Sequence, residues 1–161
     1  MSPNTRITKV SLMNFRNHLN TTLNDLGTFV VLNGKNGSGK TNILEAISLF
    51  SPGRGFKNAQ FTDIISKNQK VLSFEIRIVV AYDSGEIEIK RNFSLDKKNK
   101  NLVFVDNEKI ANSQLLDFLN IIWITPIMEK IMLQSNSEKR SFFDRLTFNV
   151  NNNHLKNLSK L

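Results

Sequence analysis

Apolar and polar side chains alternate along two stretches in the middle of the chain. Residues 71–82 place an apolar side chain at roughly every second position, and residues 86–93 repeat this spacing after the turn Asp83-Ser84-Gly85. A period of two is typical of strands with one buried face, and a short glycine-containing turn between two such runs predicts an antiparallel hairpin. The other strands that we predict are residues 6–15, 19–33, 102–105 and 121–124.

Three other segments show the spacing of helices. Residues 42–50 carry apolar side chains three and four positions apart, and residues 51–56 (SPGRGF) then end this helix and begin an exposed loop. A second helix is predicted at residues 113–119. The pair Ser135 and Glu138 has the spacing of a capping box, which predicts a third helix. The inner face of this third helix is predicted to carry Phe142, Phe143, Leu146 and Val150.

A glycine-rich motif lies between a predicted strand and a predicted helix. Residues 34–41 (GKNGSGKT) match the pattern G-x-x-x-x-G-K-[ST], and the apolar run 28–33 precedes them as a buried strand would. In this context backbone N–H groups surround a polyphosphate at the positive end of the helix. Lys40 would reach the β- and γ-phosphates, and the Thr41 hydroxyl would ligate Mg²⁺. The predicted ATP-binding residues here are Gly34, Lys35, Asn36, Gly37, Ser38, Gly39, Lys40 and Thr41.

Composition narrows the class of protein further. A length of 161 residues favours one domain, and the absence of cysteine excludes disulfides and thiolate metal sites. No apolar run reaches the ~18 residues of a membrane span and the N-terminus lacks a signal-peptide core, so we expect a cytosolic protein. The net charge of +8 suits a polyanion such as nucleic acid. A solvated basic surface is the alternative, because the charge is dispersed along the sequence.

Phosphate-loop enzymes that hydrolyse ATP also need an acidic residue at the end of a second core strand. Asp106 follows the apolar run 102–105, but Asp106-Asn107 is good turn chemistry and Lys109-Ile110 can return as a strand, so we favour a hairpin here. The run 121–124 ends in Thr125-Pro126 without an acid. The sequence therefore supplies the phosphate half of a site and not the hydrolytic half.

Several motifs, taken in order, resemble one family. Residues 14–18 (NFRNH), followed by the phosphate loop, resemble the N-terminus of the SMC, Rad50 and RecF group of ABC-type ATPases. Residues 42–47 (NILEAI) and 52–56 (PGRGF) are similar to the RecF branch of that group, which acts in bacterial DNA replication and repair. Further matches are residues 124–126 (ITP) and 138–146 (EKRSFFDRL), so that the likeness runs from about residue 6 to residue 150.

The sequence also departs from the family pattern. Lys139 stands where the family favours a second arginine, and the proline usual before that pair is absent. The family's signature motif, second acidic strand and switch histidine are not found in this chain. The chain therefore resembles the N-terminal portion of a longer polypeptide, and we expect it to bind ATP with negligible turnover.

The resemblance implies a fold, ligands and partners. The fold is an α/β phosphate-loop head (lobe I) of ABC type over residues 1–161, with an antiparallel β-subdomain at about residues 71–110. The ligands are ATP and Mg²⁺, with Arg16 and Asn17 beside the nucleotide and Gln134 as a further candidate ligand of Mg²⁺. The intact protein would dimerise around ATP, hydrolyse it, bind DNA at single-strand/double-strand junctions, and work with RecO and RecR in the cytoplasm at the nucleoid.

Some alternatives stay open at this point. Arg54 and Lys57, in the glycine-flanked loop, are candidates for contact with DNA or a partner, but solvated charges explain them equally well. The chain could be a self-contained small nucleotide or nucleoside kinase, although no arginine-rich lid is visible. A GTPase switch is disfavoured because Asn-Lys-x-Asp is absent. A non-catalytic basic nucleic-acid adaptor would bind DNA in a salt-dependent manner that is indifferent to ATP.

Overall fold

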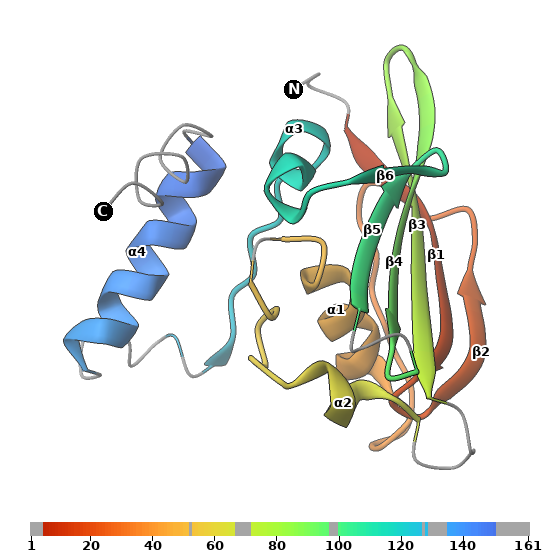
Figure 1. Ribbon diagram of the computed structural model, residues 1–161, viewed down its shortest axis with the longest axis horizontal. Coiled ribbons are helices and arrows are strands. Elements are labelled where there is room, and N and C mark those ends of the chain that lie inside the picture. Colours follow the sequence, from red (N-terminus) through yellow and green to blue (C-terminus); the bar gives the residue numbers. More distant parts are fainter. Residues whose placement is uncertain are drawn as a thin grey trace.

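Six antiparallel strands form one sheet, in the order β2-β1-β3-β4-β5-β6 (Figure 1). The computed structural model describes residues 5–51, 53–66, 72–96, 100–126, 128 and 135–150. β1 therefore lies between its sequence neighbour β2 and the distant β3. The strands are β1 Arg6–Phe15, β2 His18–Leu23, β3 Ser73–Tyr82, β4 Gly85–Ser94, β5 Lys100–Val105 and β6 Glu108–Ile110.

Both predicted hairpins are present. β3 and β4 pair from Ser73↔Ser94 to Tyr82↔Gly85, which confirms the hairpin that the alternation predicted. β5 and β6 pair around Asp106 and Asn107, whose φ angles of 46° and 69° are those of a tight hairpin turn. The carboxylate of Asp106 accepts a hydrogen bond from the backbone N–H of Glu88 at 2.8 Å. Asp106 is thus a turn residue, which confirms the hairpin that we favoured over an acidic residue at the end of a core strand.

The helices α1 to α3 lie on one side of the sheet, and α4 lies apart from it (Figure 1). Buried side chains of α1, among them Ala46, pack with Val10 and Leu12 of β1 in a single core cluster. Phe15 and Phe74 meet edge to face with ring centres 5.5 Å apart. The bounds are α1 Lys40–Ser48, α2 Phe61–Ile64, the 3₁₀ turn η1 Asn112–Gln114, α3 Leu115–Phe118 and α4 Asn136–Val150.

The predicted helices are present with one difference in their packing. α1 covers most of the predicted segment 42–50, and η1 with α3 covers all but the last residue of the segment 113–119. α4 begins directly after Ser135, where the capping motif predicted it. The proposed inner face of α4 is wrong at Phe143, which is 53% exposed.

One predicted strand is shorter than expected, and another is not formed. The strand predicted at residues 19–33 ends at Leu23, and the run 28–33 pairs with no described strand. Phe29 is 94% exposed and Val31 is 89% exposed. The run 121–124 is likewise not a strand, and Ile124 is 87% exposed. An apolar run indicates that a segment is suited to burial, but a strand also needs a neighbour for its backbone hydrogen bonds. The described residues contain no such neighbour for either run.

Arg91 of β4 is buried beneath the helices although no carboxylate pairs with it in the described part of the chain. Its guanidinium donates to the side-chain oxygens of Asn101 at 2.9 Å and Asn112 at 3.1 Å, and lies 5.9 Å from the ring centre of Phe61. Burial lowers the pKa of Arg91 to about 10. Hydrogen bonds to these neutral acceptors compensate only part of the cost of removing the cation from water.

We expect the variant Arg91→Met to be as stable as the wild type, within about 1 kcal/mol, or more stable, because an apolar side chain of similar volume carries no charge into the core. Arg91→Ala is the matched control, and it should lower the free energy of unfolding by about 2 kcal/mol or more by leaving a cavity. Denaturant titration measures both. Equal losses in the two variants would show that the charge itself stabilises the fold.

Candidate nucleotide-binding site

The glycine loop at residues 34–41 curves around the ammonium group of its own lysine. Lys40 begins α1, and its Nζ donates to the carbonyl oxygens of Gly34 at 2.7 Å and Lys35 at 2.8 Å. An ammonium group has three N–H donors, so one donor is left for a ligand in the loop. Lys35, Asn36, Ser38 and Thr41 are exposed around this lysine. The loop therefore fits an anion that approaches from solvent, and the predicted residues lie together.

The turn between β1 and β2 holds the loop from the opposite side. Asn17 Nδ2 donates to the carbonyl of Gly37 at 3.4 Å, and His18 Nε2 lies 3.1 Å from the carbonyl of Gly39. A carbonyl only accepts, so His18 carries a proton on Nε2. The other ring nitrogen lies 2.9 Å from the hydroxyl of Thr21. Asn17 was predicted beside the nucleotide, whereas His18 was not named as a site residue, although it belongs to the motif at residues 14–18.

Gly39 is one of the two points where the turn and the loop touch. Its φ is +96°, and a Cβ at this position would lie 2.4 Å from His18 Nε2 and 2.7 Å from Asn17 Oδ1. Real Cβ atoms do not come so close to polar side chains. Glycine is required here both for its left-handed backbone and for the space that the turn occupies.

Arg16 faces α1 and not the rim of the loop. Its guanidinium binds the carboxylate of Glu45 through Nε at 3.0 Å and Nη2 at 2.5 Å, and Nη1 donates to the carbonyl of Asp63 at 2.9 Å. The side chain of Glu45 is 1% exposed. Sequence reasoning missed Glu45, although a carboxylate between the apolar residues of a helix is a visible signal for a buried ion pair.

Lys57, from the loop after α1, binds the same buried carboxylate. Its Nζ lies 2.9 Å from Glu45 Oε2 and 2.8 Å from Asn42 Oδ1. One of its two partners, Glu45, is therefore buried. Arg54 of the same loop is exposed between Gly53 and Gly55, whose φ angles are 98° and 67°. Gln134, the further Mg²⁺ candidate, lies outside the described residues.

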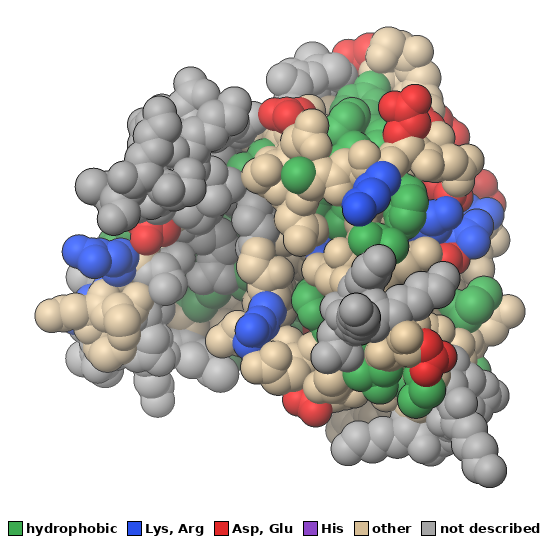
Figure 2. Space-filling model, viewed as in Figure 1, with side chains coloured by type: hydrophobic (Ala, Val, Ile, Leu, Met, Phe, Trp, Pro, Cys, Tyr) green, Lys and Arg blue, Asp and Glu red, His purple; other side chains and the backbone are tan. Residues whose placement is uncertain are grey.

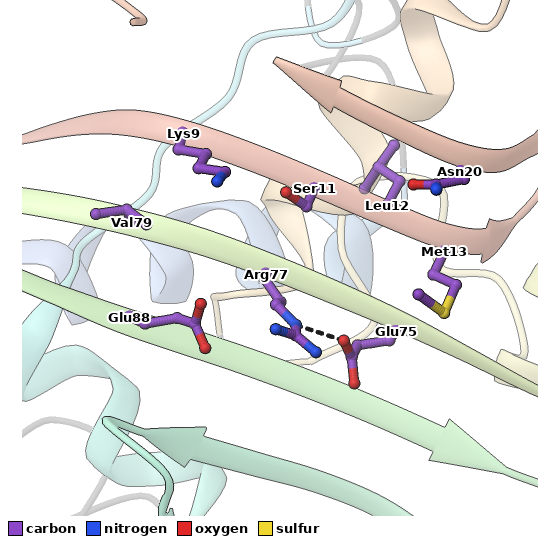
Figure 3. A pocket seen from close by; sticks show the side chains of 9 residues that line it. All are labelled: Lys9, Ser11, Leu12, Met13, Asn20, Glu75, Arg77, Val79 and Glu88. Carbon is purple, nitrogen blue, oxygen red and sulfur yellow. Dashed lines mark hydrogen bonds and ion pairs between the residues drawn. The ribbon is translucent and has the colours of Figure 1, made fainter. Parts of the chain in front are cut away.

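A hollow of about 230 Å³ lies on the opposite face of the sheet (Figure 3). Lys9 and Met13 line it, and they alternate along β1 with the buried Val10 and Leu12, which face α1. Arg77 and Glu75 form an ion pair inside it, and this hydrogen bond raises the pKa of Arg77. The hollow is therefore separate from the phosphate loop.

The positive charge of the described residues does not form one continuous patch on the face of the molecule shown in Figure 2. Figure 2 shows lysine and arginine side chains of the described residues in separate places between neutral ones, and not as a continuous band. No helix among the described residues is long and apolar enough to cross a membrane.

The phosphate loop and the sheet both lie within the part of the chain that matches a known family. A model of the RecF/RecN/SMC N terminal domain matches residues 6–128, from the start of β1 to beyond α3. The chain belongs to this family. Membership supports the ATPase class that the sequence motifs predicted, and the matched residues include the whole phosphate loop and the turn that holds it.

Named relatives of this family match most of the chain. It is 37% identical over 151 residues to the DNA replication and repair protein RecF of Rickettsia prowazekii (strain Madrid E), covering 94% of this chain and 41% of that protein. It is 39% identical over 153 residues to the protein of the same name from Rickettsia akari (strain Hartford), with the same coverage of both. The chain thus spans about two fifths of the length of these relatives.

Solved structures show the same fold. The structure of the recombination mediator protein RecF-ATP in the RecFOR pathway matches with a TM-score of 0.84 at 23% identity, covering 97% of this chain and 42% of that one. The α/β fold of an ABC-type ATPase head with an antiparallel sheet, predicted from the sequence, is therefore confirmed. The predicted bounds of a β-subdomain at residues 71–110 stay a prediction; the observed sheet contains β3 to β6 from that range, together with β1 and β2.

Proposed function

We propose that this chain is a nucleotide-binding part of a RecF-type DNA replication and repair ATPase. The observation that carries the proposal is the ammonium of Lys40, held by two carbonyls inside a glycine loop that the β1–β2 turn fixes from behind. An exposed loop with a preorganised cation fits a polyphosphate. Two further observations support the proposal: relatives named for DNA replication and repair, and a solved structure of similar fold that is described as RecF-ATP.

In this proposal each part of the site has its own task. Backbone N–H groups of residues 34–41 and the ammonium of Lys40 bind the phosphates of ATP. The hydroxyl of Thr41 holds Mg²⁺, which would neutralise phosphate charge, and Gln134 is a further candidate for this ion. Asn17 and His18 keep the loop in shape, and Arg16 contributes positive charge behind it while it binds Glu45.

The proposal extends to the activity of the intact protein. Such a protein would bind DNA at single-strand/double-strand junctions, dimerise in an ATP-dependent manner and act with RecO and RecR. We assign the DNA or partner contact to the exposed Arg54, because Lys57 is bound to Glu45. Hydrolysis would need groups from outside this chain, so the 161 residues alone should bind ATP with negligible turnover.

Lys40→Ala tests the nucleotide site. We expect the affinity for a fluorescent ATP analogue with Mg²⁺ to fall at least tenfold, since a charge-assisted contact contributes about 1.5–3 kcal/mol. Lys109→Ala is the control, because Lys109 is exposed on β6, far along the chain from the loop. Binding unchanged by Lys40→Ala would contradict the proposal. DNA binding that is equally indifferent to ATP would favour the adaptor, and brisk turnover by the chain alone would contradict the expected dependence on other groups.

A further inference from the structure

A directed chain of hydrogen bonds runs from Lys57 to the phosphate loop. Lys57 Nζ donates to Asn42 Oδ1 at 2.8 Å, and Asn42 Nδ2 donates to Asn17 Oδ1 at 2.8 Å. Asn17 Nδ2 then donates to the carbonyl of Gly37, in the middle of the loop, at 3.4 Å. Every donor and acceptor in this relay points in one direction, and hydrogen bonds in such a series strengthen one another.

A buried carboxylate fixes the start of the relay. Lys57 Nζ also binds Glu45 Oε2 at 2.9 Å, and Glu45 is held from the other side by the guanidinium of Arg16. A carboxylate with 1% exposure cannot rehydrate where it lies, so it keeps both cations in place. The ammonium of Lys57 is thus positioned by α1, although Lys57 belongs to the loop that follows this helix.

We propose that Lys57 is a positioning residue for the nucleotide: it acts on the phosphate loop through Asn42 and Asn17, without touching the ligand. This inference rests on the proposed nucleotide site. It assigns to the loop after α1 an influence on nucleotide affinity that does not depend on contact with DNA. The orientation of the Gly37 peptide matters to a polyphosphate because its neighbours supply the N–H groups of the cradle.

A double-mutant cycle separates the relay from simple attraction between Lys57 and a polyanion. The 161-residue chain is titrated with a fluorescent ATP analogue and Mg²⁺ as wild type, Lys57→Met, Asn17→Ala and the double variant. We expect Lys57→Met to weaken binding about fivefold, the value of one hydrogen bond. In the Asn17→Ala background, where the relay is already broken, Lys57→Met should have no further effect.

Two further variants make the result decisive. Asn42→Ala removes the middle of the relay without changing any charge, and it should weaken binding as much as Lys57→Met. Lys109→Met removes an exposed lysine of β6 and should change affinity less than twofold. Melting temperatures of all variants show whether the fold is intact, and Asn42→Ala carries the test if Lys57→Met is unstable.

The outcomes of this experiment are distinct. An equal effect of Lys57→Met in both backgrounds would show direct electrostatic attraction and overturn the relay. A Lys57→Met variant with the same affinity for the analogue as Lys109→Met would also overturn the relay. If the wild type binds no analogue and Lys40→Ala changes nothing, the proposed nucleotide site fails, and the relay fails with it. If the wild type binds and Lys40→Ala does not, the site stands and only the relay is being judged.

Discussion

Gly39→Ala is expected to weaken nucleotide binding at least a hundredfold. An L residue in the left-handed region costs about 1–2 kcal/mol. The new Cβ would also lie 2.4 Å from His18 Nε2 and 2.7 Å from Asn17 Oδ1, so the ends of both side chains must move away from Gly39. Their departure breaks two hydrogen bonds to loop carbonyls, each contributing about 1 kcal/mol. Without ligand the altered loop relaxes from this conformation, so binding must restore it at a cost of about 3–4 kcal/mol, which is more than two orders of magnitude in affinity.

Titration with a fluorescent ATP analogue measures the affinity, and thermal unfolding without ligand isolates the steric part. Gly37→Ala is the matched control for the unfolding experiment, because Gly37 also has a positive φ, of 81°, but no atom lies within 4 Å of an added Cβ. Gly37→Ala should therefore lower the melting temperature only through the strain of the left-handed backbone. Equal melting temperatures for the two variants would mean that contact with the β1–β2 turn does not constrain Gly39.

Glu45→Ala is expected to lower the free energy of unfolding by about 3 kcal/mol. Removing one partner of a buried ion pair commonly costs about 3–5 kcal/mol because the other charge stays behind without compensation. Here the value lies at the lower end, since the side chains of Arg16 and Lys57 are 23% and 32% exposed and can regain water. The loss of the carboxylate also separates three segments: the β1–β2 turn, α1 and the loop that carries Lys57.

Urea titration gives the free energy of unfolding for this comparison. Glu75→Ala is the control, because Glu75 pairs with Arg77 on the outer face of the sheet, where the arginine side chain is 45% exposed. A surface pair of this kind contributes about 0–1 kcal/mol. Similar losses in the two variants would show that burial adds nothing to the importance of Glu45.

Local periodicity was sufficient to predict strands that pair with the next strand in the sequence. The β3–β4 and β5–β6 hairpins need only alternation and a turn, and both were predicted. The runs 28–33 and 121–124 were predicted as strands on apolar composition and are not strands here. Pairing is a property of two segments, so the pattern within one of them cannot show whether its neighbour is present in the same chain.

The residues of the candidate site were likewise predicted only in part. The motif at residues 34–41 named the loop and Lys40 directly, because backbone geometry and phosphate chemistry both depend on those residue types. The resemblance brought in Asn17, which the structure places on the carbonyl of Gly37, and Arg16, whose partner is Glu45. The contacts of Glu45, Lys57 and Asn42 were not predicted, since they depend on how the loop after α1 folds back onto the helix. A single acid in an apolar helix was the only available sign.

The position of β1 between β2 and β3 has a consequence for the order in which the protein folds during its synthesis. β1 pairs with β3, and those partners lie about seventy residues apart, a loop whose closure costs about 4 kcal/mol of chain entropy. Chains emerge N-terminus first during translation. The phosphate loop and α1 therefore leave the ribosome while one side of β1 is still open, and the scaffold behind the nucleotide is completed only after β3 has been synthesised. We therefore expect a nascent chain to bind nucleotide in full only after β3 has paired with β1.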